Sequence, residues 1–354
     1  MIASTGEDRH SAMSLARPKR VESGSWTLKD VRVHLEYAVN LELWTIPYYM
    51  TVMYSIKDIG HPDFRRIQSV VHQEMLHAEL AANVYNSFPP AEDEREPDKG
   101  LEIGPFHYVK ELGVPHLDFG LDDEAVEKYG EPDAGLGPLD QVRIGTMCLI
   151  ELPESAPPSF DPGGDEYATI GDFYTALMSG MEENTRFVRG NRKQVAHFGR
   201  FYRGLSHTTV TGDGEAGLDQ ALELVKVITE QGEGRTDGNT DIERRYRNTA
   251  DGYENSASHF EKFNAIRADV LAGRAPEVYR HTGADPDDGH GDPRPVLVEN
   301  FGRLISFIQD MFNGHRPDHP HFGELMPTVG ANILTCWRRG FVPRFSDVEI
   351  GSST

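Results

Sequence analysis

The residues from 67 to 88 have the pattern of an amphipathic helix that carries two ionisable groups on its apolar side. The apolar positions recur at helical spacing and comprise Ile67, Val70, Val71, Ala78, Ala81, Val84, Tyr85 and Phe88. Glu74 and His77 fall within this stripe, three residues apart. Their burial is costly unless something compensates for the lost water, and a Glu-x-x-His pair facing into a helix bundle is one way to hold iron or manganese. On this motif alone a metal site is a hypothesis, and a buried Glu–His hydrogen bond or a helix rotated toward water stays the more common arrangement.

A second helix is predicted just upstream, and it adds one more inward carboxylate. Its apolar stripe comprises Val31, Leu35, Ala38, Ile46, Tyr49, Val52, Met53 and Ile56, and Glu42 lies within that stripe. Pro47 removes a backbone donor and displaces the carbonyl of Leu43, so a kink beside Glu42 would open room for a metal or a ligand. A proline that simply bends or ends the helix is the alternative. The turn at 57–62 is short enough to join the two segments as an antiparallel helical pair.

The other half of a bundle site is less complete. Residues 215–231 predict an amphipathic helix in which Glu230 lies off the apolar stripe, so ligation and a solvated carboxylate at a helix end are about equally favoured. The glycines that flank Glu233 end this helix and could bring Glu233 close to a site. His259 shares the apolar face of a helix at 253–271, with Ser256 rather than glutamate three residues before it. The inventory is three carboxylates and two histidines, one carboxylate short of the usual dinuclear set.

Six short blocks occur in order along the chain, at 41–49, 74–77, 150–154, 169–174, 228–234 and 258–260. Together they resemble the ferritin-like domain of the iminophenyl-pyruvate dimer synthases, the violacein-type enzymes, from about residue 27 to about residue 340. The resemblance implies a ferritin-like bundle and oxidative chemistry in secondary metabolism, where an imine of an aromatic amino acid is coupled oxidatively. Those enzymes carry a large extra region that this chain lacks, and an acidic residue at the position of Ser256.

Composition limits the classes of partner. A net charge of −22 over 354 residues argues against nucleic acid and against anionic membrane surfaces. Cys148 and Cys336 cannot build a disulfide scaffold, which indicates a reducing, cytoplasmic compartment, and we interpret both as small buried apolar residues. No apolar stretch is long enough to span a membrane, and the first 20 residues lack an apolar signal core.

We expect an all-α, ferritin-like four-helix bundle. The expected division is a flexible arm at 1–26 and one domain at 27–345, with core helices near 29–57, 62–88, 215–232 and 252–273. A loop-rich crossover is expected at 89–168, as this topology requires one long connection, with further helices near 170–189, 297–314 and 323–338. Glu151 ends a short apolar run within the crossover, and a capping or supporting role is favoured over ligation.

These patterns predict a metal-dependent oxidoreductase that uses O₂ to oxidise or oxidatively couple a small amine, imine or amino-acid-derived substrate. The predicted ligands are Glu42, Glu74, His77, Glu230, Glu233 and His259. Carboxylates with imidazoles suit a mononuclear or dinuclear iron centre, with copper or manganese as competitors. Trp44, Tyr48 and Tyr49 could line a substrate pocket, carry an electron or serve ordinary core packing. A homodimer is compatible with the sequence. A metal store or a metal-free binding protein is the alternative function, and no further catalytic residue is assigned.

Overall fold

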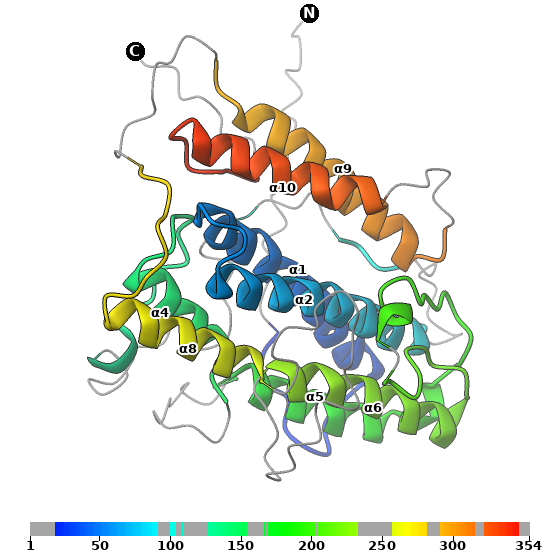
Figure 1. Cartoon of the computed structure of the whole chain (residues 1–354). Coiled ribbons are helices and arrows are strands. Elements are labelled where there is room, and N and C mark those ends of the chain that lie inside the picture. Colours follow the sequence, from blue (N-terminus) through cyan, green and yellow to red (C-terminus); the bar gives the residue numbers. More distant parts are fainter. Residues whose placement is uncertain are drawn as a thin grey trace, which may run out of the picture.

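The computed structural model describes residues 18–90, 100–103, 108, 127–153, 166–167, 169–202, 204–232, 257–281, 291–315 and 322–346. The elements are α1 (Leu28–Ser55), α2 (Pro62–Ser87), α4 (Gln141–Ile150), α5 (Ile170–Glu183), α6 (Gly214–Gly232), α8 (His259–Leu271), α9 (Arg294–Phe312) and α10 (Phe322–Arg338), with 3₁₀ turns at Thr185–Phe187 and Gly199–Phe201 (Figure 1). Strand pairing within the described residues is limited to one isolated bridge between Ile56 and Val278. The all-α prediction is confirmed.

The helices α1 and α2 form the antiparallel pair that the sequence predicts. Thr27 and Asp30 make a capping box at the start of α1, and Pro62 occupies the first position of α2, where its missing donor costs nothing. The helix α1 continues past Pro47 to Ser55 and is buried on nearly all sides, because α2, α5 and α10 each pack against it. This pair is the centre of the fold.

The other two positions of the bundle are each filled by two helices placed end to end. Two hydrogen bonds place α4 and α5 along α1. The backbone N–H of Leu139, just before α4, donates to the hydroxyl of Ser55 at the end of α1. The amide of Asn184, just after α5, donates to the backbone oxygen of Trp26, just before α1. Along α2, Arg66 near the start of the helix pairs with Asp269 of α8. Further along, His77 contacts Gln231 at the end of α6. Both composite helices, α4–α5 and α6–α8, therefore run antiparallel to their neighbours and are interrupted at the same level.

This arrangement corrects the sequence expectation for the bundle. The crossover expected at 89–168 contains α4, and α5, expected as an additional helix, belongs to the bundle. The expected helix at 252–273 begins only at His259, and its first residues lie outside the described part of the chain. Helical periodicity gives the position of a helix in the sequence, whereas which helix it packs against depends on the whole fold.

The expected N-terminal arm is described only at residues 18–26, and this part contacts the bundle. Trp26 is buried against α5, and Glu183 of α5 accepts hydrogen bonds from the backbone N–H groups of Gly24 and Trp26. Arg20 adds an ion pair with Asp172 at the start of α5. These contacts place residues 20–26 against α5.

The helices α9 and α10 pack as a pair along one side of the bundle (Figure 1). The indole N–H of Trp337 on α10 donates to the backbone oxygen of Thr51 on α1, which anchors the pair to the bundle. Cys148 and Cys336 are both unpaired and buried, as predicted. Within the described ranges, every helix is too short or too polar to cross a lipid bilayer.

Candidate metal centre

Five buried ionisable side chains meet where the two composite helices are interrupted. Glu42 comes from α1, Glu74 and His77 from α2, Glu151 from the residue that caps α4, and His259 from the first position of α8. None of the five is more than 6% exposed. The middle turns of α1 and α2, the end of α4 and the start of α8 therefore deliver these groups into the middle of the bundle.

Glu74 faces both imidazoles, whose rings stack with centroids 5.2 Å apart. Its Oε1 is 3.0 Å from Nδ1 of His259, and its Oε2 is 3.7 Å from Nδ1 of His77. Glu42 approaches the same nitrogen of His77 at 3.4 Å, and Glu151 approaches that of His259 at 3.4 Å. Glu74, His77 and His259 can each offer one ligand atom within 4.8 Å of the others, which is the spacing of groups that share an ion.

Two tyrosines orient the outer carboxylates. The hydroxyl of Tyr174 donates to Oε1 of Glu42, and that of Tyr49 donates to Oε1 of Glu151. Burial and the adjacent carboxylate raise the pKa of both phenols well above the usual value, so both stay protonated donors. The remaining oxygen of each glutamate, Oε2, is the one that faces a histidine.

The tautomer of His259 follows from its neighbours. Oε1 of Gln73 accepts from the ammonium of Lys262 and also contacts Nε2 of His259 at 3.0 Å. Because an ammonium can only donate, the atom between them must be the amide oxygen, and Nε2 of His259 must carry a hydrogen. In the neutral imidazole, Nδ1 then presents a lone pair.

That lone pair points at the oxygens of Glu74 and Glu151. Consistent with this, Nδ1 of His259 and Oε1 of Glu74 are buried and lack a hydrogen-bond partner within the described residues. Buried acceptors that face one another repel, and either a proton or a cation between them removes the repulsion. The donor set of carboxylate oxygens and imidazole nitrogens therefore fits a bound metal ion.

His77 is held in a similar way by the end of α6. Its Nε2 lies 2.8 Å from Oε1 of Gln231, so Nδ1 turns toward Glu42 and Glu74. Gly232 follows, and a Cβ at that position would lie 3.2 Å from Oε2 of Glu151. The absent side chain lets the end of α6 approach the cluster closely.

The protonation of the cluster reflects its dense charge. Burial, together with the nearby Glu151, raises the pKa of Glu74 well above its usual value. Burial opposes the ionisation of Glu42 as well, but the contacts with His77 lower its pKa overall. For His259, burial lowers the pKa and the carboxylates of Glu151 and Glu74 raise it by more. Three carboxylates in a dry interior favour added positive charge, whether as protons or as metal.

The structure brings together four of the six predicted ligands: Glu42, Glu74, His77 and His259. Glu230 is half-buried on the last turn of α6, where its neighbour Gln231 contacts His77, and Glu233 lies outside the described residues. Glu151, expected to cap or support, also directs a carboxylate oxygen at His259. In the sequence, Glu151 could be recognised only as a single acidic residue at the end of the apolar run that forms α4.

The three predicted substrate-binding aromatics have different surroundings. Tyr49 bonds to Glu151 in the cluster. Trp44 and Tyr48 are buried in a stack with Tyr108, with ring centroids 5.4 Å and 6.4 Å from that ring. The space at the cluster is a cavity of about 20 Å³, lined in part by Glu42, Glu74 and His77. That volume holds about one water-sized molecule.

Comparison with known proteins agrees with this architecture. The profile of the ferritin-like family matches residues 35–268. The chain belongs to the ferritin-like family. The crystal structure of a ferritin-like protein from Caulobacter vibrioides, at 1.95 Å resolution, is 38% identical with a TM-score of 0.70, over 91% of this chain and 99% of that one. No protein of curated function matches the chain.

Dinuclear ferritin-like centres take a glutamate from each of two helices and a Glu-x-x-His pair from each of the other two. In this chain, Glu42 and Glu151 match the single glutamates, and Glu74 with His77 matches one pair. His259 matches the second histidine, with Ser256 where its glutamate would stand. The more specific resemblance to the iminophenyl-pyruvate dimer synthases stays a prediction.

Proposed function

We propose that this ferritin-like protein is a metal-dependent oxidoreductase whose bundle holds iron and uses O₂. The observation that carries the proposal is the pair of buried acceptors, Nδ1 of His259 and Oε1 of Glu74, 3.0 Å apart without a hydrogen-bond partner in the described part of the chain. Such an arrangement costs stability unless a proton or a cation lies between the two atoms, and a metal ion would supply that positive charge.

Glu42, Glu74, His77, Glu151 and His259 would hold the metal. Bound iron would supply the electrons that reduce O₂, and mixed carboxylate and imidazole ligation suits that metal, with manganese or copper as competitors. The absence of a glutamate at Ser256 favours a mononuclear or asymmetric centre over a symmetric dinuclear one.

The chain itself supplies orientation, exclusion of water and proton control. Gln73 and Gln231 fix the two imidazoles so that their Nδ1 atoms face the cluster. The hydroxyls of Tyr49 and Tyr174 keep their protons and donate hydrogen bonds to Glu151 and Glu42. These supporting contacts are the kind that tune ligand basicity and geometry in metal sites.

We further propose a small amine, imine or amino-acid-derived molecule as the compound that is oxidised or coupled. The resemblance of six sequence blocks to the iminophenyl-pyruvate dimer synthases supports this class of substrate. The cavity at the cluster, about 20 Å³, suits a diatomic oxidant.

A second candidate function is metal binding or storage without an organic substrate. The same cavity favours it, because the described residues at the cluster leave no room for an amine or imine. The two candidates predict different use of O₂, since storage consumes it only in proportion to the metal loaded.

The test is O₂ uptake by protein reconstituted anaerobically with ferrous iron, with and without a panel of amines and imines. The proposal predicts substrate-dependent uptake beyond the iron added, lost in Glu151→Leu and in His259→Gln. The control His207→Gln, which alters a half-buried histidine near Glu223, should behave like wild type. Uptake that stops at the iron stoichiometry with every compound would favour storage, and failure to bind iron would refute both.

A further inference from the structure

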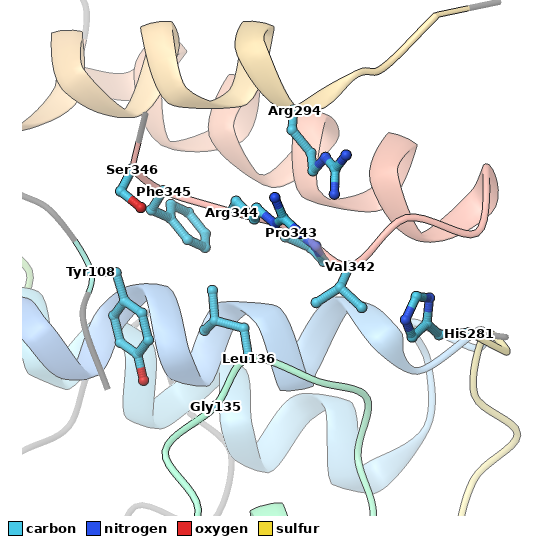
Figure 2. A pocket seen from close by; sticks show the side chains of 10 residues that line it. All are labelled: Tyr108, Gly135, Leu136, His281, Arg294, Val342, Pro343, Arg344, Phe345 and Ser346. Atoms are coloured by element: carbon cyan, nitrogen blue, oxygen red, sulfur yellow. The ribbon is translucent and has the colours of Figure 1, made fainter. Parts of the chain in front are cut away.

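A second, larger cavity lies between the bundle and the α9–α10 pair. It has a volume of about 460 Å³, within the range of small-molecule sites. Its walls are the segment from Val342 to Ser346 after α10, the first residue of α9, the turn at Gly135 and Leu136, and the side chains of Tyr108 and His281 (Figure 2). Unlike the centre inside the bundle, it has room for an organic molecule.

Three basic side chains line this cavity. Arg344 is exposed and makes no hydrogen bond or ion pair with any residue that the structure describes. Arg294 is buried, paired with Asp292 through its guanidinium and placed over the ring of Phe341. His281 faces the backbone oxygen of Gly340 through Nδ1, so Nδ1 donates, and Nε2 donates to an anionic ligand when the imidazole is protonated.

The cavity is lined by more positive than negative side chains, in contrast to the acidic chain as a whole. Two guanidinium groups are opposed by one described carboxylate, that of Asp292, and Asp292 is already held by Arg294. The chain as a whole carries a net charge of −22. Arg344 acts electrostatically on Asp292 but forms no ion pair among the described residues, and a cation placed in this way at the wall of a cavity favours an anionic ligand.

The remaining walls are apolar and well supported. The ring of Phe345 packs against that of Phe301 with centroids 4.8 Å apart. The ring of Tyr108 stacks on Trp44, and its hydroxyl donates to the backbone oxygen of Ala134. Leu136 contributes an aliphatic surface beside Tyr108 (Figure 2). Rigid aromatic and aliphatic walls favour a ligand with a flat apolar body.

We propose that this cavity is a binding site for a small organic carboxylate with an aromatic or aliphatic body. Arg344 binds the carboxylate, the protonated imidazole of His281 adds a hydrogen bond, and Phe345, Leu136 and the ring of Tyr108 enclose the apolar part. The site is separate from the cluster of Glu74, His77 and His259, so the proposal goes beyond the proposed function and does not depend on bound metal.

The test is calorimetric titration of the full-length protein with 3-phenylpropionate as the probe. Loss of one charge-assisted hydrogen bond weakens binding by about tenfold or more, so Arg344→Met should lower the affinity by roughly that factor. The matched control Arg338→Met removes an exposed arginine that does not line the cavity and should keep the affinity within about twofold. The neutral 3-phenylpropionamide should also bind about tenfold more weakly.

Two further variants separate this site from the metal centre. Leu136→Trp fills the cavity and should abolish binding, whereas Glu74→Gln should leave it unchanged. The proposal is overturned if 3-phenylpropionate shows no saturable binding, if Arg344→Met binds it as tightly as wild type, or if Glu74→Gln abolishes the binding.

Discussion

Lys262 is a fully buried residue that shares one hydrogen-bond partner, Gln73, with His259 of the cluster. Its ammonium bonds to Gln73, and this bond orients the amide that holds His259. The sequence shows Lys262 three residues after His259, but its partner is 189 residues away along the chain. The supporting contacts of the centre could therefore not be predicted, whereas Glu42, Glu74, His77 and His259 could, because each lies on an apolar helical stripe.

Lys262→Met should weaken metal binding by about 10- to 100-fold, since Gln73 is then free to rotate and His259 loses its fixed tautomer. Anaerobic titration with ferrous or cobaltous ion measures the affinity. The control Lys226→Met removes an exposed lysine of α6 and should bind metal like wild type. Equal affinities of the two variants would show that the tautomer is set in another way.

His34 predicts how the free energy of unfolding changes with pH. It is buried, its Nδ1 donates to the backbone oxygen of Asp30, and its Nε2 accepts from the hydroxyl of Tyr167. Burial lowers its pKa below the ordinary value of 6.5. The unfolded chain therefore takes up a proton at a higher pH than the folded protein does, and the stability contribution present above that pH is lost as the pH falls.

Urea unfolding of wild type and His34→Gln near neutral pH and at about pH 5 checks this expectation. Wild type should lose more unfolding free energy on acidification than the variant, which cannot titrate at this position. An equal loss in both proteins would assign the acid sensitivity to other groups.

At the scale of elements, the close approach of α5 to the segment before α1 depends on Gly180. A Cβ at this position would lie 2.3 Å from the indole of Trp26, which cannot move because it is buried. Gly302 of α9 is the opposite case, since nothing lies within 4 Å of a Cβ built there. The two glycines are a matched pair for testing the packing of α5.

Gly180→Ala should lower the free energy of unfolding by about 1–3 kcal/mol through overpacking. Gly302→Ala should raise it by about 0.5–1 kcal/mol, because alanine favours an exposed helix position. Chemical denaturation of both variants decides between these signs. A stabilising Gly180→Ala would mean that α5 does not pack against Trp26 as described.

Some helices could be predicted from the sequence and one could not. The bounds of α1, α2 and α6 were predicted to within about two residues, because long apolar periodicity specifies a helix. The ten-residue α4 was assigned to the crossover, since it follows a Pro- and Gly-rich stretch and is too short for a strong periodic signal. Glu151, its capping residue, was therefore not counted among the ligands.

At the scale of the whole molecule, there are two sites with side chains of opposite charge. One lies inside the bundle, and the other lies between the bundle and the α9–α10 pair. The inner centre concentrates carboxylates in a cavity of about 20 Å³, and the outer cavity of about 460 Å³ is lined by arginines. The sequence predicted the first site from side chains on apolar stripes. It gave no indication of the second, because the residues of that cavity come from distant loops and helix ends.

The central claim is a metal centre among Glu42, Glu74, His77, Glu151 and His259, and elemental analysis tests it most directly. Protein purified without an affinity tag should contain about one or two ions of iron, or of manganese or copper, per chain. The variant Glu74→Ala/His77→Ala should contain none. Equal metal in both proteins, or none in wild type even after anaerobic reconstitution, would contradict the account.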